Sequence, residues 1–581
     1  MEKNKLELKR HSLAHILAAA IKELYPKAQL AIGPAIDNGF YYDIDFGDHK
    51  FSDTELPVVE GKMKELIKAR LEFKRDEKEI GLALAEAQSA GEIYKAELIA
   101  DLKAQGEIKV SFYTVGKFTD LCRGPHVANT SELDPKSFSL TKLAGAYWRG
   151  DEKNAMLTRI YGLAFANSKE LAQYQQLIIE AEKRDHRKLG KELELFMLHE
   201  FAPGMPFFLP KGMVMVKELI DFIREYSYGA GYQEVRTPQI LNADLWKVSG
   251  HWDHYQQDMF CLHHHEDNVD LGIKPMNCPA HMLVYKNRIH SYKELPLRLA
   301  ETTTLYRNEK SGTLHGLTRV RSLSQDDSHI FLRPEQIGDE IADLLGKIKN
   351  IYQVFNLQID SVYLSTRPEK FLGEKADWDA AELLLKKALD ESGLNYVINE
   401  GDGAFYGPKI DVQVKDALGR LWQLATIQLD SQLPQRFGLT YDDAEGGEKT
   451  PVVIHRALLG SIERFLGVII EHYAGAMPLW LSPGQVRIVP ISESHVGYAQ
   501  DLARALEAHK IRVEVDANNE TVGNKIRKAS NEKLPYVVVI GDEEMKSGNL
   551  AVRLRGEREN RQLKQEELIV ELVEKIKKRL N

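Results

Sequence analysis

Residues 306–331 read YRNEKSGTLHGLTRVRSLSQDDSHIF, and this stretch decides the fold. Strand-like runs flank the central segment EKSGTLHGLT, which predicts two neighbouring strands joined by a long loop. The stretch carries three arginines and then Asp326, Asp327 and His329. Such groups are costly to bury in a sheet without partners. A ligand with phosphate, amine and hydroxyl groups would supply partners for most of them.

The bulk composition narrows the protein's class. A chain of 581 residues is too long for one hydrophobic core, so we expect three or more domains. No apolar run approaches the roughly 20 residues that a membrane span needs, and the N-terminal apolar run, interrupted by His11 and His15, predicts a folded helix. The three cysteines, Cys122, Cys261 and Cys278, form no CxxC pair, which indicates a reducing, cytoplasmic location. A net charge of -9 argues against indiscriminate nucleic-acid binding.

The order of predicted elements divides the chain into four parts. Residues 1–168 combine helices, including one predicted over 57–77, with a strand–turn–strand pattern. Residues 169–194 are helical and basic, with no clear core of their own, which is typical of a connector. Residues 195–483 mix helices with alternating strands, which predicts an antiparallel sheet with one packed face. In residues 484–581 three short apolar strands alternate with helical patterns, which predicts an α/β domain with a parallel core. The predicted fold class is multidomain α+β and α/β.

Arginines in two separate motifs provide phosphate-binding chemistry. Arg307 and Arg319 flank Glu309 in the quoted stretch, and Arg464 lies in the first turns of a helix that begins with GSIERFLG. Guanidinium forks suit phosphate oxygens, although Arg307, Glu309 and Arg319 alone would be read as a surface ion-pair ladder. Together, YRNE and GSIERFLG resemble motifs 2 and 3 of class II aminoacyl-tRNA synthetases. The stretch GMVMVKELIDFIREYSYGAGYQEVRTPQI resembles motif 1, which builds the dimer interface in that family.

Longer motifs make the resemblance more specific. The segments KPMNCPAH, RNEKSGTLHGLTRVR, QDDSHIF, GAFYGPKIDV and VIHRALLGSIERF are similar to those of threonyl-tRNA synthetases. HSLAH and DLCRGPH resemble that family's editing domain, and the tail resembles its anticodon-binding domain, so the likeness covers nearly the whole chain. It implies a homodimer with a class II antiparallel catalytic core, an α+β editing domain and a C-terminal α/β anticodon-binding domain.

The resemblance also implies the reaction. The enzyme would activate L-threonine with ATP and Mg²⁺ and transfer it to the 3′ end of tRNA(Thr). Negative charge gathers in the transition state, so stabilisation should be mostly electrostatic. Arg307 would bind the α-phosphate, and Glu309 would read the adenine amine. Leu323 stands where the family usually has phenylalanine, so adenine would be covered without π-stacking. The other implied ATP-site and catalytic residues are Arg319, Lys409, Gln423 and Arg464.

Three residues far apart in sequence form the implied metal site. No spacing rule groups Cys278, His329 and His455, but the resemblance makes them the ligands of one Zn²⁺ per subunit. Three protein ligands leave an open position, as in catalytic zinc sites. The amine and hydroxyl of threonine would fill it, and Asp327 would accept from the hydroxyl, which valine lacks. The rest of the implied amino-acid and adenosine pocket is Gln325, Tyr406 and Gln428.

Serine could also contact the zinc ion and Asp327, because it carries both an amine and a hydroxyl. Its missing methyl group is worth only about 1–3 kcal/mol of discrimination, so a second, hydrolytic site for seryl-tRNA is expected. The resemblance assigns this metal-free site to His11, His15, Lys95, Asp120, Cys122 and His126. Read without the resemblance, the paired histidines and Cys122 also fit a structural zinc site, and this alternative stays open. HSLAH lacks the glutamate of HExxH, which argues against protease chemistry.

The tail is expected to read the anticodon. Matching by motif assigns base contacts in a single-stranded loop to four residues: Asn519, Arg527, Glu544 and Arg553. Each of them alone would be an ordinary solvated residue. HSLAH begins at residue 11, so the small ubiquitin-like domain that precedes the editing domain in many bacterial members is expected to be absent.

Two alternative functions remain at this stage. One is a synthetase for another small amino acid, against which the zinc ligands and Asp327 argue. The other is an RNA-binding regulator that has lost catalysis, against which Arg307, Arg319 and Arg464 argue. A separate histidine run, His263–His265 after Cys261, is predicted to be an exposed loop rather than a metal site.

Overall fold

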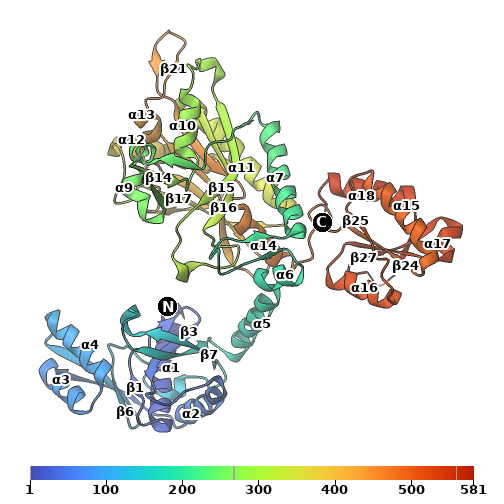
Figure 1. The fold of residues 1–581 in the computed structure, drawn as a ribbon. Helices are drawn as coiled ribbons and strands as arrows, with labels where there is room; N and C mark the ends of the chain where they lie inside the picture. The colour runs from blue at the N-terminus through green and yellow to red at the C-terminus, as the bar shows by residue number, and fades with distance from the viewer. Residues whose placement is uncertain (1, 266–267, 558, 581) are drawn as a thin grey trace. The chain divides into compact units, whose positions relative to one another are not determined.

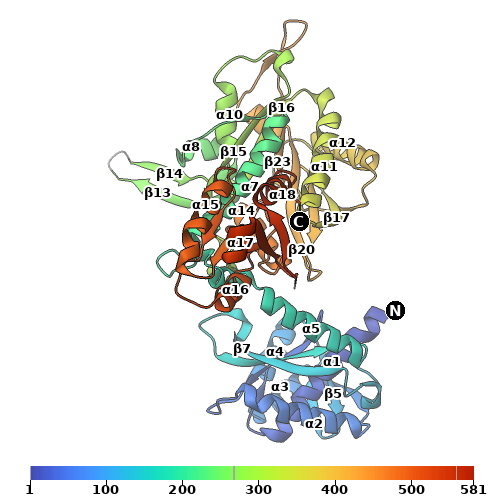
Figure 2. The same cartoon turned by 90° about the vertical axis from the view of Figure 1, so that its right-hand side faces the viewer.

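The computed structural model divides into two compact units, Met1–Ile179 and Glu180–Asn581. It describes residues 2–265, 268–557 and 559–580. Within these ranges no helix has both the length and the apolar character needed to cross a membrane. Figure 1 and Figure 2 show the elements of each unit from two directions.

Unit 1 is built around its first helix. Its elements are α1 Glu2–Leu24, β1 Gln29–Leu30, β2 Ala35–Ile36, β3 Gly39–Asp45, α2 Leu56–Lys68, β4 Phe73–Glu79, α3 Ile80–Ser89, α4 Ile93–Ala104, β5 Lys109–Val115, β6 Phe118–Leu121, β7 Phe138–Tyr147 and β8 Met156–Ala164. Helix α5, Ser168–Arg184, begins in unit 1 and ends in unit 2. All side chains from Leu13 to Ile21 are buried, because α1 is packed on every side. The main sheet has the order β1-β3-β8-β7 with β2 paired to β3, and β4-β5-β6 form a second sheet.

The first part of unit 2 contains an eight-stranded sheet. Its elements are α6 His186–Glu192, β9 Phe196–Met197, β10 Phe207–Phe208, α7 Pro210–Gly229, β11 Gln233–Glu234, β12 Ile240–Asn242, α8 Ala243–Ser249, α9 His251–Tyr255, β13 Phe260–His264, β14 Val269–Ile273, α10 Cys278–Lys286, β15 Leu297–Tyr306, β16 Ser322–Leu332, α11 Ile337–Val354, β17 Gln358–Ser365, α12 Lys375–Ser392, β18 Tyr396–Asn399, β19 Lys409–Lys415, β20 Leu421–Asp430, α13 Gln432–Arg436, β21 Tyr441–Asp442, β22 Glu448–Lys449, β23 Val452–Ala457 and α14 Ile462–His472. The strand order is β11-β15-β16-β23-β20-β19-β17-β18.

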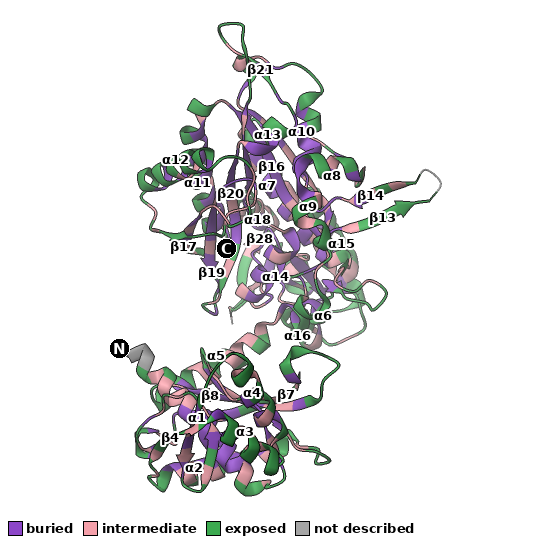
Figure 3. Cartoon of the chain, turned by 90° about the vertical axis from the view of Figure 1, so that its left-hand side faces the viewer, coloured by how far each residue is buried: buried purple, intermediate pink, exposed green. Residues whose placement is uncertain are grey.

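Register in this sheet brings distant residues together. β15 and β16 form the predicted antiparallel pair, with Leu299 opposite His329. β23 then pairs with β16 so that His455 lies opposite His329, and with β20 so that Gln428 also lies opposite His455. The central strands and α14 are largely buried, as Figure 3 shows. The polar groups of β16 therefore lie inside the unit, where only a partner or a ligand can satisfy them.

The end of the chain forms a five-stranded sheet. Its elements are β24 Val486–Pro490, α15 Val496–Glu507, β25 Val513–Val515, α16 Val522–Asn531, β26 Tyr536–Ile540, α17 Asp542–Ser547, β27 Asn549–Leu554, β28 Arg561–Lys564 and α18 Gln565–Lys577. β25, β24 and β26 are parallel, as the sequence predicts. β27 and β28 extend the sheet in antiparallel fashion, which the sequence analysis missed.

Two local predictions were wrong. The helix expected over 57–77 ends at Lys68, and Phe73–Glu79 is a strand. Its charged side chains are mostly exposed and only its backbone pairs with β5, so it shows no hydrophobic alternation. The histidine run is exposed as expected, but His263 and His264 belong to strand β13 rather than to a loop. Figure 2 shows that β13 and β14 form a projecting hairpin.

Candidate active site and metal centre

A polar cavity of about 210 Å³ lies over the sheet between the quoted hairpin and α14. Arg307 and Arg319 both line it, but they lie in the loop just outside β15 and β16, not on the strands themselves as a simple hairpin would have them. Many of the predicted nucleotide-site residues line this cavity: Arg307, Glu309, Arg319, Leu323, Gln325, Gln423 and Arg464.

The three arginines give the cavity a positive lining. Arg319 Nε lies 2.9 Å from Glu309 Oε2, Arg464 Nε donates to the Thr318 carbonyl at 2.9 Å, and Arg307 Nε donates to the Pro275 carbonyl at 3.3 Å. Burial, followed by repulsion from Arg307 and Arg319, lowers the pKa of Arg464 from its ordinary value. An anion bound among these groups would relieve this repulsion, so the cavity suits a polyphosphate.

Asp326 has no proposed contact with a substrate. Its side chain connects β16 to the start of α14. Its carboxylate accepts from the backbone N–H groups of Leu458, Leu459 and Gly460 at 2.7–3.1 Å. The Arg456 guanidinium lies 3.3 Å from it. Asp326 therefore fixes the chain just before Arg464, a positioning function that its place in QDDSHIF did not reveal.

Glu463 is a second buried carboxylate in this region. Its Oε2 accepts from the Ser324 N–H at 2.7 Å and from the Ser461 hydroxyl at 3.0 Å. Burial nevertheless raises its pKa from 4.5 to about 7, because it disfavours the charged form.

Glu463→Gln is expected to remove a pH dependence of stability. The Glu463 carboxyl group binds its proton more tightly in the folded chain than in the unfolded chain. The free energy of unfolding therefore falls as pH rises from about 5 to 7, by about 3 kcal/mol. Thermal unfolding midpoints should therefore shift in favour of the glutamine variant between pH 5 and pH 8. Parallel midpoint curves for the two proteins would contradict this expectation.

The three predicted metal ligands converge. Cys278 is the first residue of α10, and His329 and His455 are cross-strand neighbours on β16 and β23. One potential ligand atom from each lies within 4.8 Å of the others, and all three residues are buried. His329 Nε2 and His455 Nδ1 are buried atoms with no hydrogen-bond partner among the described residues. A thiol and two free ring nitrogens are the donor set of a zinc site with an open position.

Buried groups behind the histidines determine their tautomers. His281 Nε2 lies 3.1 Å from Glu301 Oε2, which can only accept, so His281 Nδ1 must accept from His329 Nδ1–H at 2.8 Å. Lys274 Nζ, 3.0 Å from Glu301, holds this carboxylate charged. The relay leaves the lone pair of His329 at Nε2, the orphaned atom. Such outer contacts orient metal-binding histidines in general.

His455 is arranged in the opposite sense. Its Nε2 donates to Asp430 Oδ2 at 2.9 Å, which leaves Nδ1 for a proton or a metal ion. Burial acts to lower the pKa of His455, yet Cys278 and Asp430 outweigh it and raise the pKa to about 10. Burial lowers the pKa of His329 well below its ordinary value. The His329 imidazole is therefore neutral, whereas the surroundings of His455 favour positive charge. This combination suits a divalent cation.

The predicted amino-acid pocket surrounds this centre. Asn277 Nδ2 donates to Asp327 Oδ2 at 3.0 Å, and the Tyr406 ring lies 5.2 Å from that of His455. Gln428 Nε2 lies 3.4 Å from the Gly407 carbonyl. Lys409, predicted to meet a carboxylate or phosphate, is instead held by Asp411 at 2.7 Å and Asp402 at 3.2 Å.

In unit 1, three predicted residues form a compact cluster. Cys122 Sγ lies 3.3 Å from His11 Nε2 and 3.2 Å from His126 Nε2. Burial raises the pKa of Cys122 and lowers that of His126 to about 2, so the cluster favours neutral groups. A cavity of about 560 Å³ opens beside Cys122 and is lined by residues including Ser111 and Arg123. That volume lies in the range of small-molecule sites.

The other three predicted residues lie around this cluster. Lys95 and Asp120 form a buried ion pair at 2.6 Å, and the Tyr42 hydroxyl donates to Asp120 at 2.5 Å. His15 donates from Nε2 to the Tyr113 carbonyl at 3.2 Å, and burial lowers its pKa to about 4. His15 packs edge-on to His126 but contributes no atom to the cluster of possible ligands.

The four predicted anticodon residues are spread over the C-terminal sheet and its helices. Asn519 precedes α16, Arg527 lies on α16, Glu544 on α17 and Arg553 on β27. Asn519 and Arg527 are exposed, whereas Glu544 accepts from the Gly541 N–H at 2.8 Å and caps its own helix.

Sequence reasoning missed the supporting groups Lys274, His281, Glu301 and Asp430. They are 20–30 residues from their partners or on other strands, so no spacing could have identified them. The only available signal was for His281 and Asp430, which are polar residues in the otherwise largely apolar stretches CPAHMLVY and LATIQLD.

Comparisons with protein families agree with this architecture. Residues 260–473 match the class II tRNA synthetase core domain (G, H, P, S and T), and residues 485–575 match the anticodon binding domain. Residues 110–161 match the threonyl and alanyl tRNA synthetase second additional domain.

Individual relatives are similar over nearly the full chain. Threonine–tRNA ligase of Carboxydothermus hydrogenoformans is 50% identical over 98% of this chain and 89% of its own length. Threonine–tRNA ligase of Clostridioides difficile is 51% identical over 100% of this chain and 89% of its own length. A crystal structure titled the RNA binding domain of threonyl-tRNA synthetase from Cryptosporidium parvum has a TM-score of 0.66 and 43% identity, covering 67% of this chain and 98% of that one.

Proposed function

This chain belongs to the threonine–tRNA ligase family of class II synthetases, and from this premise we propose which of its residues carry each step. The enzyme activates L-threonine with ATP and Mg²⁺, transfers the threonyl group to the 3′ end of tRNA(Thr), and hydrolyses mischarged seryl-tRNA(Thr) in unit 1. The observation that carries the assignment is the arginine-lined cavity over the same sheet that carries His329 and His455, which converge with Cys278 of α10.

Activation takes place in the cavity over the sheet. The threonine carboxylate attacks the α-phosphorus of ATP, a P–O bond forms, and pyrophosphate leaves with the electrons of the broken bond. Arg307 stabilises the charge on the α-phosphate, with Arg319 and Arg464 on the other phosphates or the ribose side. Glu309 reads the adenine amine, while Leu323 and Gln423 line the adenosine site. Lys409 acts at the substrate carboxylate or phosphate, after release from Asp402 and Asp411.

Cys278, His329 and His455 hold one zinc ion per chain in this proposal. When bound, the ion would provide coordination positions for the amine and hydroxyl of threonine. Asp327, oriented by Asn277, accepts from that hydroxyl. Valine has no hydroxyl group, so it cannot contact the ion or Asp327 in this way. Burying the polar groups of the pocket without a hydroxyl partner is costly. Gln325, Tyr406 and Gln428 complete the pocket.

The test is amino-acid-dependent ATP–pyrophosphate exchange on protein whose zinc content has been measured. Threonine should support far more exchange than serine, valine should support none, and about one zinc should be bound per chain. A lack of exchange with all three amino acids would favour a regulator that has lost catalysis. Exchange that persists after chelation of zinc would reject the zinc assignment alone.

Proofreading is placed at the cluster around Cys122. His11, Cys122 and Lys95 would position water and the seryl ester, assisted by Asp120, with His15 and His126 completing the pocket. The neutral cluster and the adjoining cavity support this placement. The same three ligand atoms would suit a structural zinc site, so a second zinc per chain would favour that alternative.

Cys122→Ala is expected to let seryl-tRNA(Thr) accumulate while threonylation stays within about twofold. The thiol lies in unit 1, where it contacts His11, His126 and the Gly124 N–H, so its loss should slow deacylation by about 10²-fold, the scale of one positioned catalytic group. Deacylation of purified Ser-tRNA(Thr) measures the effect. Unchanged deacylation, or an equal loss of threonylation, would argue against this site.

The remaining assignments follow the same family. We propose a cytoplasmic homodimer that associates through the motif 1 region, residues 212–240, which light scattering can test. Asn519, Arg527, Glu544 and Arg553 would contact anticodon bases. The functional domains would be 1–168 for editing, 169–194 as linker, 195–483 for catalysis and 484–581 for anticodon binding.

A further inference from the structure

His186, at the start of α6, is a fully buried histidine that none of the proposed steps uses. Its backbone N–H and its Nδ1 both contact Glu471 Oε1, at 3.0 and 2.5 Å, and its Nε2 lies 2.9 Å from the Leu317 N–H. A backbone N–H can only donate, so Nε2 accepts and Nδ1 carries the proton that goes to Glu471. Both ring nitrogens are therefore engaged in one defined tautomer.

The turn from His315 to Thr318 lies directly on this imidazole. Thr318 N–H donates to the His315 carbonyl at 3.0 Å, which closes the turn. Gly316 has a φ of +49°, and a Cβ there would lie 2.0 Å from His186 Nε2. No side chain fits between the turn and the ring. The position of the turn therefore depends on His186.

The same turn reaches the proposed ATP site. The Thr318 carbonyl accepts from Arg464 Nε, and Thr318 and Arg464 both line the nucleotide cavity. Arg464 and Glu471 are seven residues apart on α14, so they share one face of that helix. Between them, a Cβ at Gly467 would lie 3.1 Å from Thr318 Cγ2. α14 thus contacts the turn near its start and His186 near its end.

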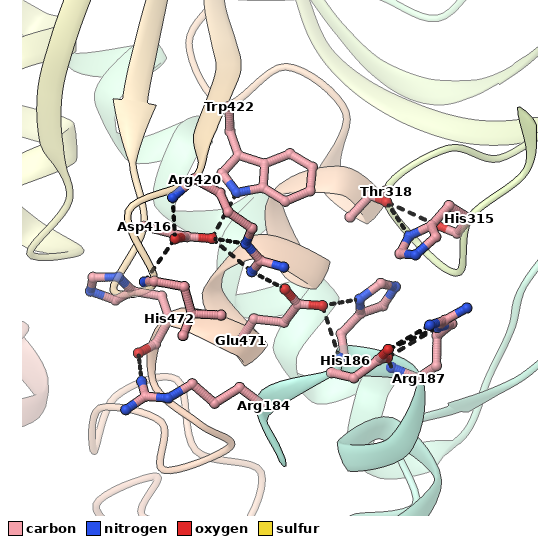
Figure 4. Close-up of polar contacts among 12 residues, drawn as sticks. Arg184, His186, Arg187, His315, Thr318, Asp416, Arg420, Trp422, Glu471 and His472 are labelled. Atoms are coloured by element: carbon pink, nitrogen blue, oxygen red, sulfur yellow. Dashed lines mark hydrogen bonds and ion pairs between the residues drawn. The ribbon is translucent and has the colours of Figure 1, made fainter. Parts of the chain in front are cut away.

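Glu471 contacts His186 through Oε1 and the Arg420 guanidinium through Oε2. Figure 4 shows the chain of contacts from His186 through Glu471 to Arg420 and Asp416. Burial acts to raise the pKa of Glu471, but the hydrogen bonds from His186 and the Arg420 contact outweigh it and lower the pKa.

A metal site among Asp185, His186 and Glu471 is a competing reading, since their potential ligand atoms are close together. Arginines already occupy both carboxylates: Arg187 binds Asp185, and Arg420 binds Glu471. His186 Nε2 already accepts from a backbone N–H. A cation would have to displace all three contacts, so the network is a positioning network.

We propose that His186 is a positioning residue for ATP binding. Oriented by Glu471, its neutral imidazole holds the 315–318 turn through Leu317, so that the Thr318 carbonyl fixes Arg464 at the nucleotide. This inference rests on the proposed ATP site.

Two substitutions separate the two ring contacts. The amide of His186→Asn reaches only the position of Nδ1, so this variant keeps the contact with Glu471 and loses the hydrogen bond from the Leu317 N–H. The amide of His186→Gln reaches the place of Nε2 and can accept from Leu317. The asparagine variant should raise KM for ATP about tenfold, the effect of one lost buried hydrogen bond, while KM for threonine stays within twofold. The glutamine variant should recover most of the loss.

Both constants come from ATP–pyrophosphate exchange without tRNA. Arg184→Gln is the matched control, because Arg184 donates to the His472 carbonyl of α14 and does not touch the turn. Gly316→Ala keeps His186 and displaces the turn, so it should raise KM for ATP even if His186→Asn fails to fold.

The outcomes distinguish the possibilities. Equal rises in KM for ATP and threonine, or a lowered thermal midpoint with KM for ATP unchanged in His186→Asn and Gly316→Ala, would overturn the inference. Arg464→Ala in the same assay tests its premise. If Arg464→Ala leaves KM for ATP unchanged, the ATP site itself is misassigned; if it raises KM and the other two variants do not, only the role of His186 is wrong.

Discussion

Arg307→Ala is expected to reduce threonine-dependent ATP–pyrophosphate exchange by about 10³-fold in kcat/KM. Arginines placed on a reacting phosphate contribute factors of about 10³ or more, and Arg307 lines the proposed nucleotide cavity. The side chain donates to the Pro275 carbonyl at 3.3 Å, a long contact whose loss should change stability little. The fall in exchange should therefore come without a matching fall in thermal midpoint.

Three further measurements make this result specific. Arg307→Lys keeps the charge but loses the planar fork, so it should recover only part of the rate. Arg288→Ala removes an exposed arginine that pairs with Glu294, and it should leave exchange unchanged. Zinc content of Arg307→Ala should equal that of the unmodified protein. Full exchange activity in Arg307→Ala would refute the ATP-site assignment.

Cys278→Ala should abolish zinc binding and, with it, threonine activation. The thiolate is the one negatively charged ligand of the proposed centre, and its loss leaves two neutral imidazoles. We expect zinc to fall from about one per chain to near zero and threonine-dependent exchange to fall by at least about 10²-fold, the effect of misplacing a reactant.

The chain offers a matched cysteine control. Cys261 is exposed on the β13–β14 hairpin, so Cys261→Ala should keep both zinc and activity. Cobalt substitution gives a readout independent of activity, because the thiolate-to-metal absorption should disappear in Cys278→Ala and persist in Cys261→Ala. Retained metal in Cys278→Ala would show that another donor set binds it.

The supporting groups extend the same argument. Glu301 orients His329 through His281, and Asp430 orients His455 directly, so both carboxylates would support the proposed zinc ligands without binding the ion themselves. His186 bears a similar relation to Arg464. In each case a buried carboxylate, acting directly or through a second histidine, determines which ring nitrogen carries the proton. The other ring nitrogen is then left as a hydrogen-bond acceptor or proposed metal ligand.

Much of the fold was readable from local pattern. The four strand-like runs expected in the catalytic sheet, 297–309, 319–331, 409–416 and 421–430, correspond to β15, β16, β19 and β20, and the three parallel strands of the tail are also present. Strand 73–79 was missed because its side chains are mostly solvated and carry no alternation. Strands β27 and β28 were missed because β27 pairs antiparallel with β26, and β28 antiparallel with β27, at the end of an otherwise parallel pattern.

The site divides in the same way. Motifs within one stretch, such as RNEKSGTLHGLTRVR and GSIERFLG, pointed to the arginines that line the cavity, because residues close together in the sequence also lie close together in the fold. Cys278, His329 and His455 were grouped only by family resemblance. Their convergence depends on the pairing of β23 with β16 and on the position of α10. Asp430 reaches His455 through the pairing of β20 with β23, whereas His186 reaches Glu471 because α6 packs against α14. Periodicity and short motifs are local properties that the sequence determines by itself. Strand register and the packing of remote helices depend on burial of the whole core. Only the tertiary structure therefore decided which histidine nitrogen faces which partner.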